Sequence, residues 1–196
     1  MKLFFGKKKE EITEVSTNPA YSVPDFEEIK EFSDIVHIFD YVLHPDFKIA
    51  NRAGIAINRL FHSVDLFRSK KLYQNCKYLR INKADIKGFH KFDSQIELTL
   101  LCIATLNGNG YTREEALIRL DKLHVQRSIP FFLFRLADWV VPIRTKAEQA
   151  IRKFIKSENT IYFIRNHKQV SWLLQVLRND LSGLYLEIIH SISQKR

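Results

Sequence analysis

Residues 135–151 read RLADWVVPIRTKAEQAI, and a similar turn and helix occur 31 residues earlier, in residues 107–120 (NGNGYTREEALIRL). Four pairs of residues share this spacing: Asn107 with Asp138, Arg113 with Arg144, Ala116 with Ala147, and Leu120 with Ile151. A helix–turn–helix unit that recurs at a fixed period is the signature of an α-solenoid, in which each helix pair buries its apolar stripe against the next. The sequence therefore predicts stacked helical hairpins here.

The turn after residue 137 carries a carboxylate, an aromatic ring and a nearby cation, which an active-site loop could also use. We favour a structural interpretation, because no reactive partner group accompanies these residues. Asp138 is expected to accept a backbone N–H at the start of the following helix, and Pro142 suits the first turn of that helix. Arg144 is expected to bridge to a turn carboxylate or carbonyl of the adjoining unit. Trp139 is expected to cover the end of the hairpin.

Periodic apolar positions extend the helical prediction along the chain. They indicate roughly eight helices joined by short loops, at residues 25–43, 46–64, 94–106, 112–123, 131–136, 142–156, 161–177 and 184–192. Three sites have the form of capping boxes: Asp25 with Glu28, Ser94 with Glu97, and Thr112 with Glu115. Asp46 suits the N-cap of the second helix. Small residues within 50–56 would let a neighbouring helix approach that helix closely.

Two segments lack this helical period. Residues 1–22 combine charged and polar residues without periodic apolar positions, so we expect a mobile tail ahead of a single domain at 23–196. Residues 65–92 mix aromatic residues with lysines and arginines, and could form turns, a short helix or short strands.

These patterns resemble those of the HEAT and armadillo-like repeat proteins, in particular small bacterial HEAT-like proteins. The resemblance is carried by Pro130, Leu133, Leu136, Asp138, Arg144, Ala147, Ala150 and Ile151, and the second-helix pattern also occurs at Arg113, Ala116 and Leu120. It is clearest over residues 94–156. It implies an all-α, right-handed solenoid of about four antiparallel helix pairs, interrupted by an irregular segment near 65–92. A period of 31 is shorter than the roughly 40 residues of typical HEAT units.

Composition and cysteine usage narrow the class of protein. Cys76 and Cys102 belong to no CxxC motif, which fits neither a disulfide framework nor a zinc site. The opening MKLFFGKKKEE lacks the roughly 7–15 apolar residues of a secretory signal, and no window approaches the ~18 apolar residues of a membrane span. We therefore expect a cytoplasmic protein with no membrane span.

The positive charge is unevenly distributed. The formal net charge is +9, yet residues 1–50 hold more Asp and Glu than Lys and Arg, and residues 68–91 hold eight basic residues and only one acidic residue. Such a region attracts phosphate, acidic proteins or anionic surfaces. Second helices commonly line the concave side of solenoids, where exposed lysines could extend this basic region. The candidate partner-binding residues are Arg119, Lys122, Lys146, Lys153, Lys156, Lys77, Arg80, Lys83 and Lys87.

Sharper chemical hypotheses have less support. His37, Asp40 and His44 would share one helix face, as metal ligands require, but no third or fourth strong ligand is evident nearby. The glycines of residues 107–110 lack the context of a phosphate-binding motif. A few HEAT-like solenoids are DNA glycosylases, for which Asp138, Trp139 and Trp172 are the only material here. We predict neither catalytic residues, nor a metal, nor a cofactor, nor a small-molecule substrate.

The sequence thus predicts a non-enzymatic scaffold that binds another protein through its second helices. The rival partner is nucleic acid, bound through the same lysines on phosphates with Tyr73 and Tyr78 available for stacking. Salt dependence would distinguish the two partners, because phosphate contacts weaken steeply as salt rises.

Overall fold

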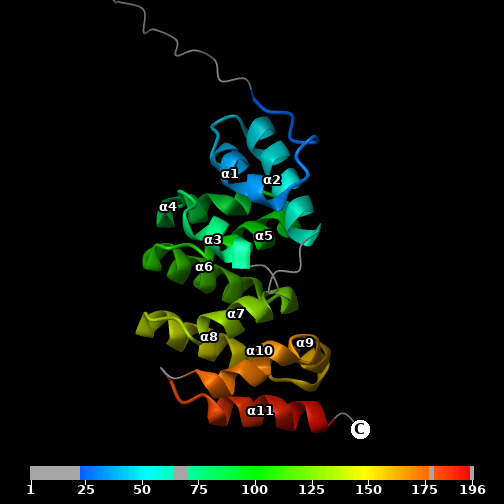
Figure 1. The fold of residues 1–196 in the computed structure, drawn as a ribbon, viewed down its shortest axis with the longest axis vertical. Coiled ribbons are helices and arrows are strands. Elements are labelled where there is room, and N and C mark those ends of the chain that lie inside the picture. Colours follow the sequence, from blue (N-terminus) through cyan, green and yellow to red (C-terminus); the bar gives the residue numbers. More distant parts are fainter. Residues whose placement is uncertain (1–22, 64–69, 177–178, 195–196) are drawn as a thin grey trace, which may run out of the picture.

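The computed structural model describes residues 23–63, 70–176 and 179–194, which contain helices and turns but no strand. Figure 1 shows the helices lying in successive layers along the long axis, with α1 and α2 at one end and α11 at the other. The expected all-α class is therefore confirmed. The tail predicted at residues 1–22 lies outside the described residues.

The first predicted helix is shorter than its sequence pattern indicated. A turn follows Asp25, a 3₁₀ turn spans Phe32–Asp34, and only then does α1 begin, at Ile35–Val42. The expected capping box is absent, because Asp25 Oδ1 accepts the N–H of Glu27 at 3.0 Å within a turn. The prediction of a helix over 25–43 was wrong in its first ten residues.

A tertiary contact explains this break. Arg59, on α2 (Phe47–Ser63), donates from Nη2 to the carbonyl oxygens of Phe26 and Ile29, both at 2.9 Å. Phe26 is buried and meets the ring of Tyr41 edge-on at 5.5 Å. Burying this ring and satisfying Arg59 both require the backbone to leave the helical path. The N-cap predicted for α2 is confirmed, since Asp46 Oδ1 accepts the N–H of Lys48 at 2.8 Å.

Helix α2 packs closely on α5 (Ser94–Ala104), as the small residues predicted. A Cβ atom at Gly54 would lie 2.9 Å from Cγ2 of Ile96, so a larger side chain would force the helices apart. The N-cap of α5 is Asp93, whose Oδ1 accepts the N–H of Gln95 at 2.9 Å. The prediction of a capping box at Ser94 is therefore wrong, because the N-cap lies one residue earlier.

The segment without a sequence period forms short helices. Helix α3 spans Lys70–Lys77, α4 spans Lys83–Lys87, and a 3₁₀ turn covers Gly88–Lys91. A capping box starts α4, because Asn82 accepts the N–H groups of Ala84 and Asp85 while Asp85 Oδ2 accepts the N–H of Asn82. Residues 64–69 lie outside the described residues.

The repeated part of the chain forms α6 (Gly110–Leu123), α7 (Ile129–Arg135) and α8 (Val141–Phe154). Pro130 and Pro142 both occupy a first helical turn, and the prediction for Pro142 is confirmed. The capping box predicted at Thr112 is wrong, because Asn109 caps α6 by accepting the N–H of Tyr111 at 3.0 Å. The buried hydroxyl of Thr112 donates instead to the carbonyl oxygen of Ile81 at 2.9 Å.

The last part of the chain contains α9 (Thr160–Arg165), α10 (His167–Trp172), a 3₁₀ turn and α11 (Ser182–Ser193). A single helix over 161–177 was predicted, but Asn166 interrupts it, its side-chain amide donating to the carbonyl oxygen of Tyr162 at 2.7 Å. Side chains of this type compete with the helical backbone. The described residues form eleven α-helices, more than the predicted eight.

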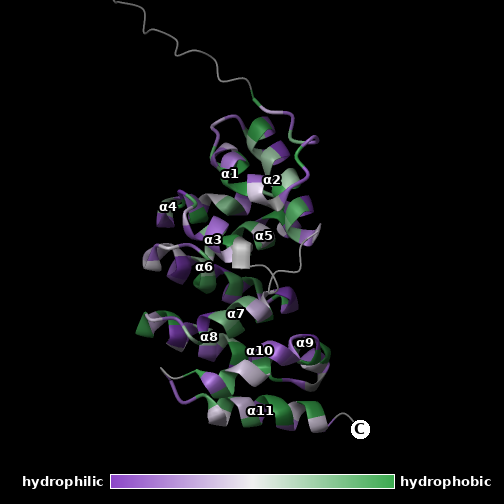
Figure 2. Ribbon diagram, viewed as in Figure 1, coloured by the Kyte–Doolittle hydropathy of each residue, from purple (hydrophilic) through white to green (hydrophobic). Residues whose placement is uncertain are grey.

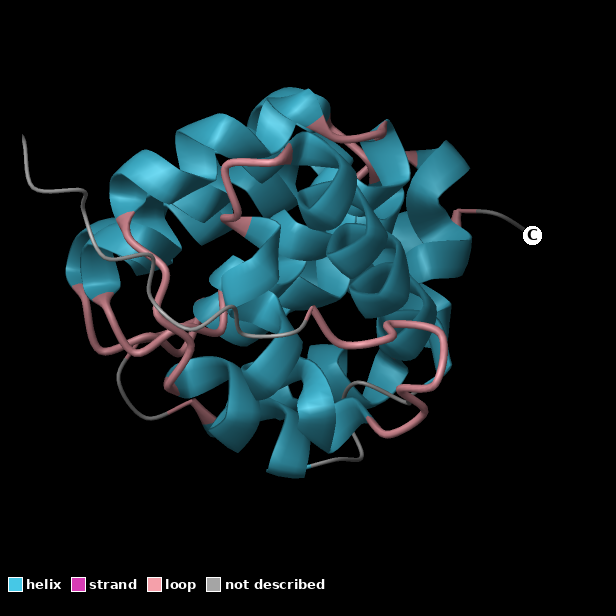
Figure 3. Ribbon diagram, turned by 90° about the horizontal axis from the view of Figure 1, so that it is seen from above, coloured by secondary structure: helices cyan, strands magenta, loops and turns pink. Residues whose placement is uncertain are grey.

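The apolar core runs the length of the stack. Buried hydrophobic residues extend from Phe26 to Ile188 as one cluster. Figure 2 shows polar and apolar residues alternating along most helices, as is typical of amphipathic helices, and Figure 3 shows the layers overlying one another when seen from above. No helix among the described residues has the length and apolar character needed to cross a membrane.

Candidate partner-binding surface

Arg113 and Arg144 occupy matching places in two successive turns. Arg113 Nη1 donates to the carbonyl oxygens of Asn107 and Gly108, six and five residues earlier, at 3.0 and 2.9 Å. Arg144 Nη1 donates to those of Asp138 and Trp139, at the same two offsets and at 2.9 and 3.3 Å. The repeat of 31 residues is therefore a repeat of hydrogen-bond geometry. Arg144 closes its own turn instead of bridging to an adjoining unit.

Asp138 joins the two units. Its buried carboxylate accepts Nε and Nη2 of Arg113 at 2.9 and 3.0 Å, across a sequence separation of 25. It also accepts Nη1 of Arg135 at 2.8 Å and the N–H of Val140 at 3.0 Å. The last bond confirms the expected N–H contact at the start of α8. One carboxylate thus orders its own turn and clamps that turn to the preceding one.

Two cations hold this carboxylate in its ionised form. Burial alone raises the pKa of Asp138, but hydrogen bonds from Arg113, Val140 and Arg135 outweigh burial and lower the pKa below its ordinary value. Arg135 has a lowered pKa, chiefly because it is desolvated, and its Nε and Nη2 atoms have no hydrogen-bond partner among the described residues. Its guanidinium instead lies 4.4 Å from the ring centroid of Phe134, a cation–π contact.

The turn at residues 77–82 is attached to the turn at 107–112. The N–H of Gly108 donates to the carbonyl oxygen of Lys77 at 2.9 Å, and Asn107 Nδ2 donates to that of Leu79 at 2.7 Å. A Cβ atom at Gly110 would lie 3.7 Å from Val140, so the turns at 107–112 and 138–142 are also in contact. We call residues 77–82, 107–112 and 138–142 together the turn edge.

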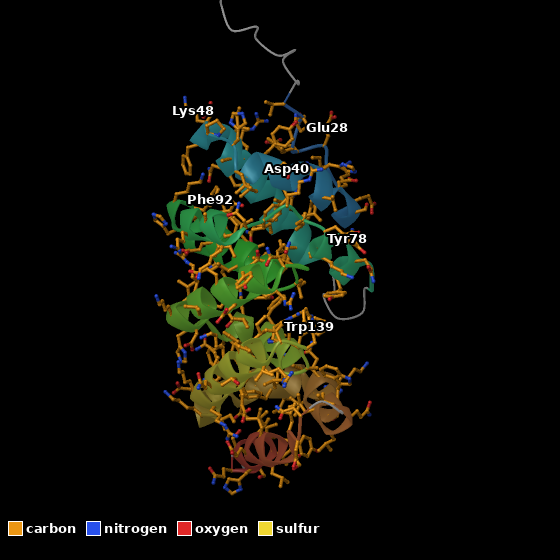
Figure 4. The ribbon with its side chains drawn as sticks, turned by 90° about the vertical axis from the view of Figure 1, so that its left-hand side faces the viewer. Glu28, Asp40, Lys48, Tyr78, Phe92 and Trp139 are labelled. Carbon is orange, nitrogen blue, oxygen red and sulfur yellow. The ribbon has the colours of Figure 1, made fainter. Side chains whose placement is uncertain are left out.

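The turn edge exposes large aromatic side chains. Tyr78, Tyr111 and Trp139 are 69%, 75% and 69% exposed, one in each turn, and Val141 is also exposed. Figure 4 shows Tyr78 and Trp139 on the same half of the stack, with Trp139 nearer the α11 end. Lys77 Nζ lies 5.4 Å from the ring centroid of Tyr78. Trp and Tyr are enriched among the residues that contribute most to binding at protein interfaces.

Four of the nine predicted partner-binding residues form ion pairs with acidic residues on neighbouring helices. Lys83 pairs with Glu115 at 3.5 Å, Lys146 with Glu114 at 3.6 Å, Lys153 with Asp121 at 2.5 Å, and Arg119 with Glu97 at 3.0 Å. Arg152 adds a pair with Glu187 on α11. The second helices therefore carry alternating charge along the stack.

The other five predicted residues have no acidic partner in the described part of the chain. Lys122 and Lys156 are exposed, on α6 and just beyond α8. Arg80 and Lys87 are also exposed, and the carbonyl oxygen of Lys87 accepts Nη1 of Arg119. Lys77 and Arg80 belong to the turn edge, whose only acidic residue is the buried Asp138. The exposed part of this edge is therefore basic and aromatic.

Sequence reasoning did not single out Tyr111 and Val141. Tyr73 was expected, like Tyr78, to be available for stacking, but it meets Phe134 edge-on at 5.7 Å and is partly buried. A usable signal existed, because Tyr111 follows Asn-Gly-Asn-Gly in a turn, where large apolar residues are unusual.

The sharper chemical hypotheses find little support in the geometry. His37 and Asp40 are exposed on α1, and His44 Nδ1 accepts the N–H of Asp46. Among the described residues, no group of three His, Cys, Asp or Glu side chains could hold a metal ion. Both carboxylate oxygens of Asp138 are engaged by arginines and Val140, so this carboxylate is not presented to a substrate.

Both cysteines are buried. Burial raises the pKa of Cys76 to about 12 and raises the pKa of Cys102 as well, so neither is a thiolate at neutral pH.

In comparisons with family models, curated proteins and solved structures, nothing matches the chain. Functional assignment consequently depends on the geometry of the turn edge.

Proposed function

We propose that the protein is a non-enzymatic scaffold, a HEAT-like right-handed solenoid that binds a protein partner through its turn edge. The observation that carries this proposal is the column of three exposed rings, Tyr78, Tyr111 and Trp139. Aromatic side chains on a rigid support supply binding energy at low entropic cost, and they commonly anchor protein interfaces.

The three turns that carry the rings are tied to one another. Hydrogen bonds join the first turn to the second, and the Arg113–Asp138 pair joins the second to the third. Arg113 also lies 6.0 Å from the ring centroid of Trp139. The matching hydrogen bonds of Arg113 and Arg144 support a repeat architecture of HEAT-like type. Pre-organised rings lose little conformational freedom on binding, which favours affinity.

The partner is expected to present acidic residues around an apolar patch. Lys77 and Arg80 contribute positive charge at the turn edge, and the exposed Lys122 and Lys156 extend it along the second helices. Charge complementarity of this kind steers association and fixes orientation more than it adds affinity. The sequence favoured the second helices. The geometry favours the turn edge, because three of the five candidate residues on or beside the second helices, Arg119, Lys146 and Lys153, already form ion pairs.

Nucleic acid is the less favoured partner. A polyanion that followed the second helices would meet Glu114, Asp121 and Glu187, and it would have to break their ion pairs. Phosphate-binding surfaces depend on cations that are free to release counterions. At the turn edge, the cations beside the three rings are the exposed Arg80 and the partly buried Lys77.

The test compares matched variants in one capture experiment. The full chain, a Trp139→Ala/Tyr111→Ala double variant and a Leu186→Ala control are immobilised and exposed to extract of the source cells. Leu186 is 64% exposed on α11, far along the chain from the turn edge, so its variant removes a comparable apolar side chain elsewhere. A protein retained by the full chain and the control, and lost by the double variant, is the expected result.

Two outcomes would overturn the proposal. Equal retention by all three chains would remove the turn edge from the interface. Loss of the captured material after nuclease treatment would instead identify nucleic acid as the partner. The log of its binding constant should then fall with the log of salt concentration at about 0.9 per neutralised phosphate of duplex DNA.

A further inference from the structure

A cavity of about 410 Å³ opens between elements that are far apart in the sequence and separate from the turn edge. Its walls come from the end of α2, the middle of α5, the start of α7 and the break between α9 and α10. The lining residues are Phe61, His62, Leu98, Thr99, Cys102, Gln126, Arg127, Pro130, Phe131, Tyr162, Arg165 and Asn166. A volume of a few hundred Å³ is typical of sites for small organic molecules.

One part of the cavity lining, its floor, is apolar. Phe61 and Phe131 stack with ring centroids 5.9 Å apart and planes tilted by 19°. Leu98 and Cys102 are buried beside them on α5. Because these side chains come from three helices packed together, the apolar floor exists before any ligand enters.

The lining also carries positive charge. Arg127 and Arg165 contribute this charge, and no Asp or Glu is among the described residues that line the cavity. Arg127 donates from Nη1 to Oε1 of Gln95, a neutral acceptor, at 2.9 Å. The guanidinium of Arg165 lies 6.0 Å from the ring centroid of Tyr162.

No carboxylate among the described residues neutralises the charge of Arg127 or Arg165. Other arginines do have a carboxylate partner. Arg113, Arg135, Arg119 and Arg152 each pair with Asp or Glu. Within residues 23–63, 70–176 and 179–194, neither Arg127 nor Arg165 forms an ion pair with a carboxylate. Burial and the nearby charge of Arg127 both lower the pKa of His62, consistent with a positive potential at this site.

We propose that this cavity binds a small organic anion, in which a carboxylate or phosphate group is attached to an aromatic or other apolar body. Arg127 and Arg165 hold the anionic group, since guanidinium matches both carboxylate and phosphate geometry. Phe61 and Phe131 contact the apolar body. The inference does not rest on the proposed scaffold function, because the cavity and the turn edge share no residue.

The experiment titrates the folded full-length chain with phenyl phosphate and with benzoate, using calorimetry and nuclear magnetic resonance. Benzyl alcohol supplies the ring without charge, and inorganic phosphate supplies the charge without a ring. At least one aromatic anion is expected to bind saturably and to shift resonances of Thr99 and Cys102, which line the cavity. Both benzyl alcohol and inorganic phosphate are expected to bind at least tenfold more weakly.

Matched variants distinguish a built site from a general positive field. Arg127→Gln and Arg165→Gln are each expected to weaken binding roughly 10- to 100-fold, as expected for loss of a charged hydrogen-bonding partner. Lys122→Gln removes the same charge at an exposed position outside the cavity, and it should leave the affinity within about twofold. Arg127 and Arg165 are themselves exposed, and circular dichroism checks that their variants fold.

Three results would overturn the proposal. The first is absence of saturable binding by both aromatic anions. The second is an affinity for benzyl alcohol or for inorganic phosphate equal to that for the aromatic anions. Equal binding of benzyl alcohol would show that the cations do not contribute, and equal binding of inorganic phosphate would show that the apolar floor does not. The third is an equal loss of affinity in the Lys122→Gln chain, which would reduce the effect to net charge.

Discussion

Replacing Asp138 with alanine should destabilise the protein more than any exposed charge substitution. The carboxylate accepts three bonds from the two arginines and one from Val140. The side chains of Arg113 and Arg135 are only 3% and 5% exposed, so the variant leaves two guanidiniums desolvated without a counter-charge. Removing one partner of a buried ion pair costs about 3–5 kcal/mol of unfolding free energy.

That cost is measurable by urea unfolding. Far-ultraviolet circular dichroism reports the helices, and the fluorescence of the two tryptophans reports their surroundings. For a chain of this size, a loss of about 3–5 kcal/mol lowers the melting temperature by roughly 6–20 °C. Coincident transitions by both probes are needed, because helical repeat arrays can unfold in parts.

A matched control and a double-mutant cycle make the test specific. Glu114→Gln breaks the exposed pair with Lys146 and should cost no more than about 1 kcal/mol. In an Arg135→Met background, Asp138→Ala leaves one unpaired guanidinium instead of two, so the coupling energy should be about 0.5–3 kcal/mol. If Asp138→Ala costs no more than Glu114→Gln, the carboxylate does not clamp the two turns and the reasoning fails.

Three further predictions concern acid, packing and thiols. Because the folded-state pKa of Asp138 is lowered, its stabilisation is complete above the unfolded pKa of about 4 and is lost as pH falls towards the folded value. In the Asp138→Asn variant, the free energy of unfolding measured with urea should therefore fall less steeply as pH is lowered below about 4. Gly54→Val should lower the free energy of unfolding by about 1–3 kcal/mol, because its Cβ would lie 2.9 Å from a side-chain carbon of α5. Gly183→Ala should raise it by about 0.4–1 kcal/mol, because a Cβ at residue 183 would meet only open space. Thermal melts of the two variants measure both changes. Cys76 and Cys102 should resist iodoacetamide in the native protein at pH 7.5 and react only in denaturant, as read by mass spectrometry; rapid native labelling would contradict their burial.

Much of the fold follows from the sequence because the relevant forces are local. Amphipathic periodicity predicted α2, α6 and α8, and Pro130 and Pro142 marked the first turns of their helices. The spacing of 31 residues also predicted that Arg113 and Arg144 occupy equivalent positions. Both arginines bind carbonyl groups five and six residues earlier, so their geometry depends only on the turn and the helix that follows it.

Errors at the helix ends have a common cause. Asp93 and Asn109 cap their helices in place of Ser94 and Thr112, because several neighbouring polar residues can serve as caps and packing selects among them. The hydroxyl of Thr112 is drawn to a carbonyl of the preceding turn. Arg59 likewise removes the start of the first predicted helix by binding carbonyl groups more than 29 residues away.

The sequence by itself determined which residues form helices and turns, since these depend on periodicity and on bonds between near neighbours. Only the tertiary structure decided that Asp138 reaches Arg113, that one ring from each of three turns shares an exposed edge, and that Arg127 and Arg165 line one cavity. Those relations join residues some 25 or more positions apart. They depend on how helices stack, which is fixed by the fit of side chains between layers and is not encoded in any local pattern.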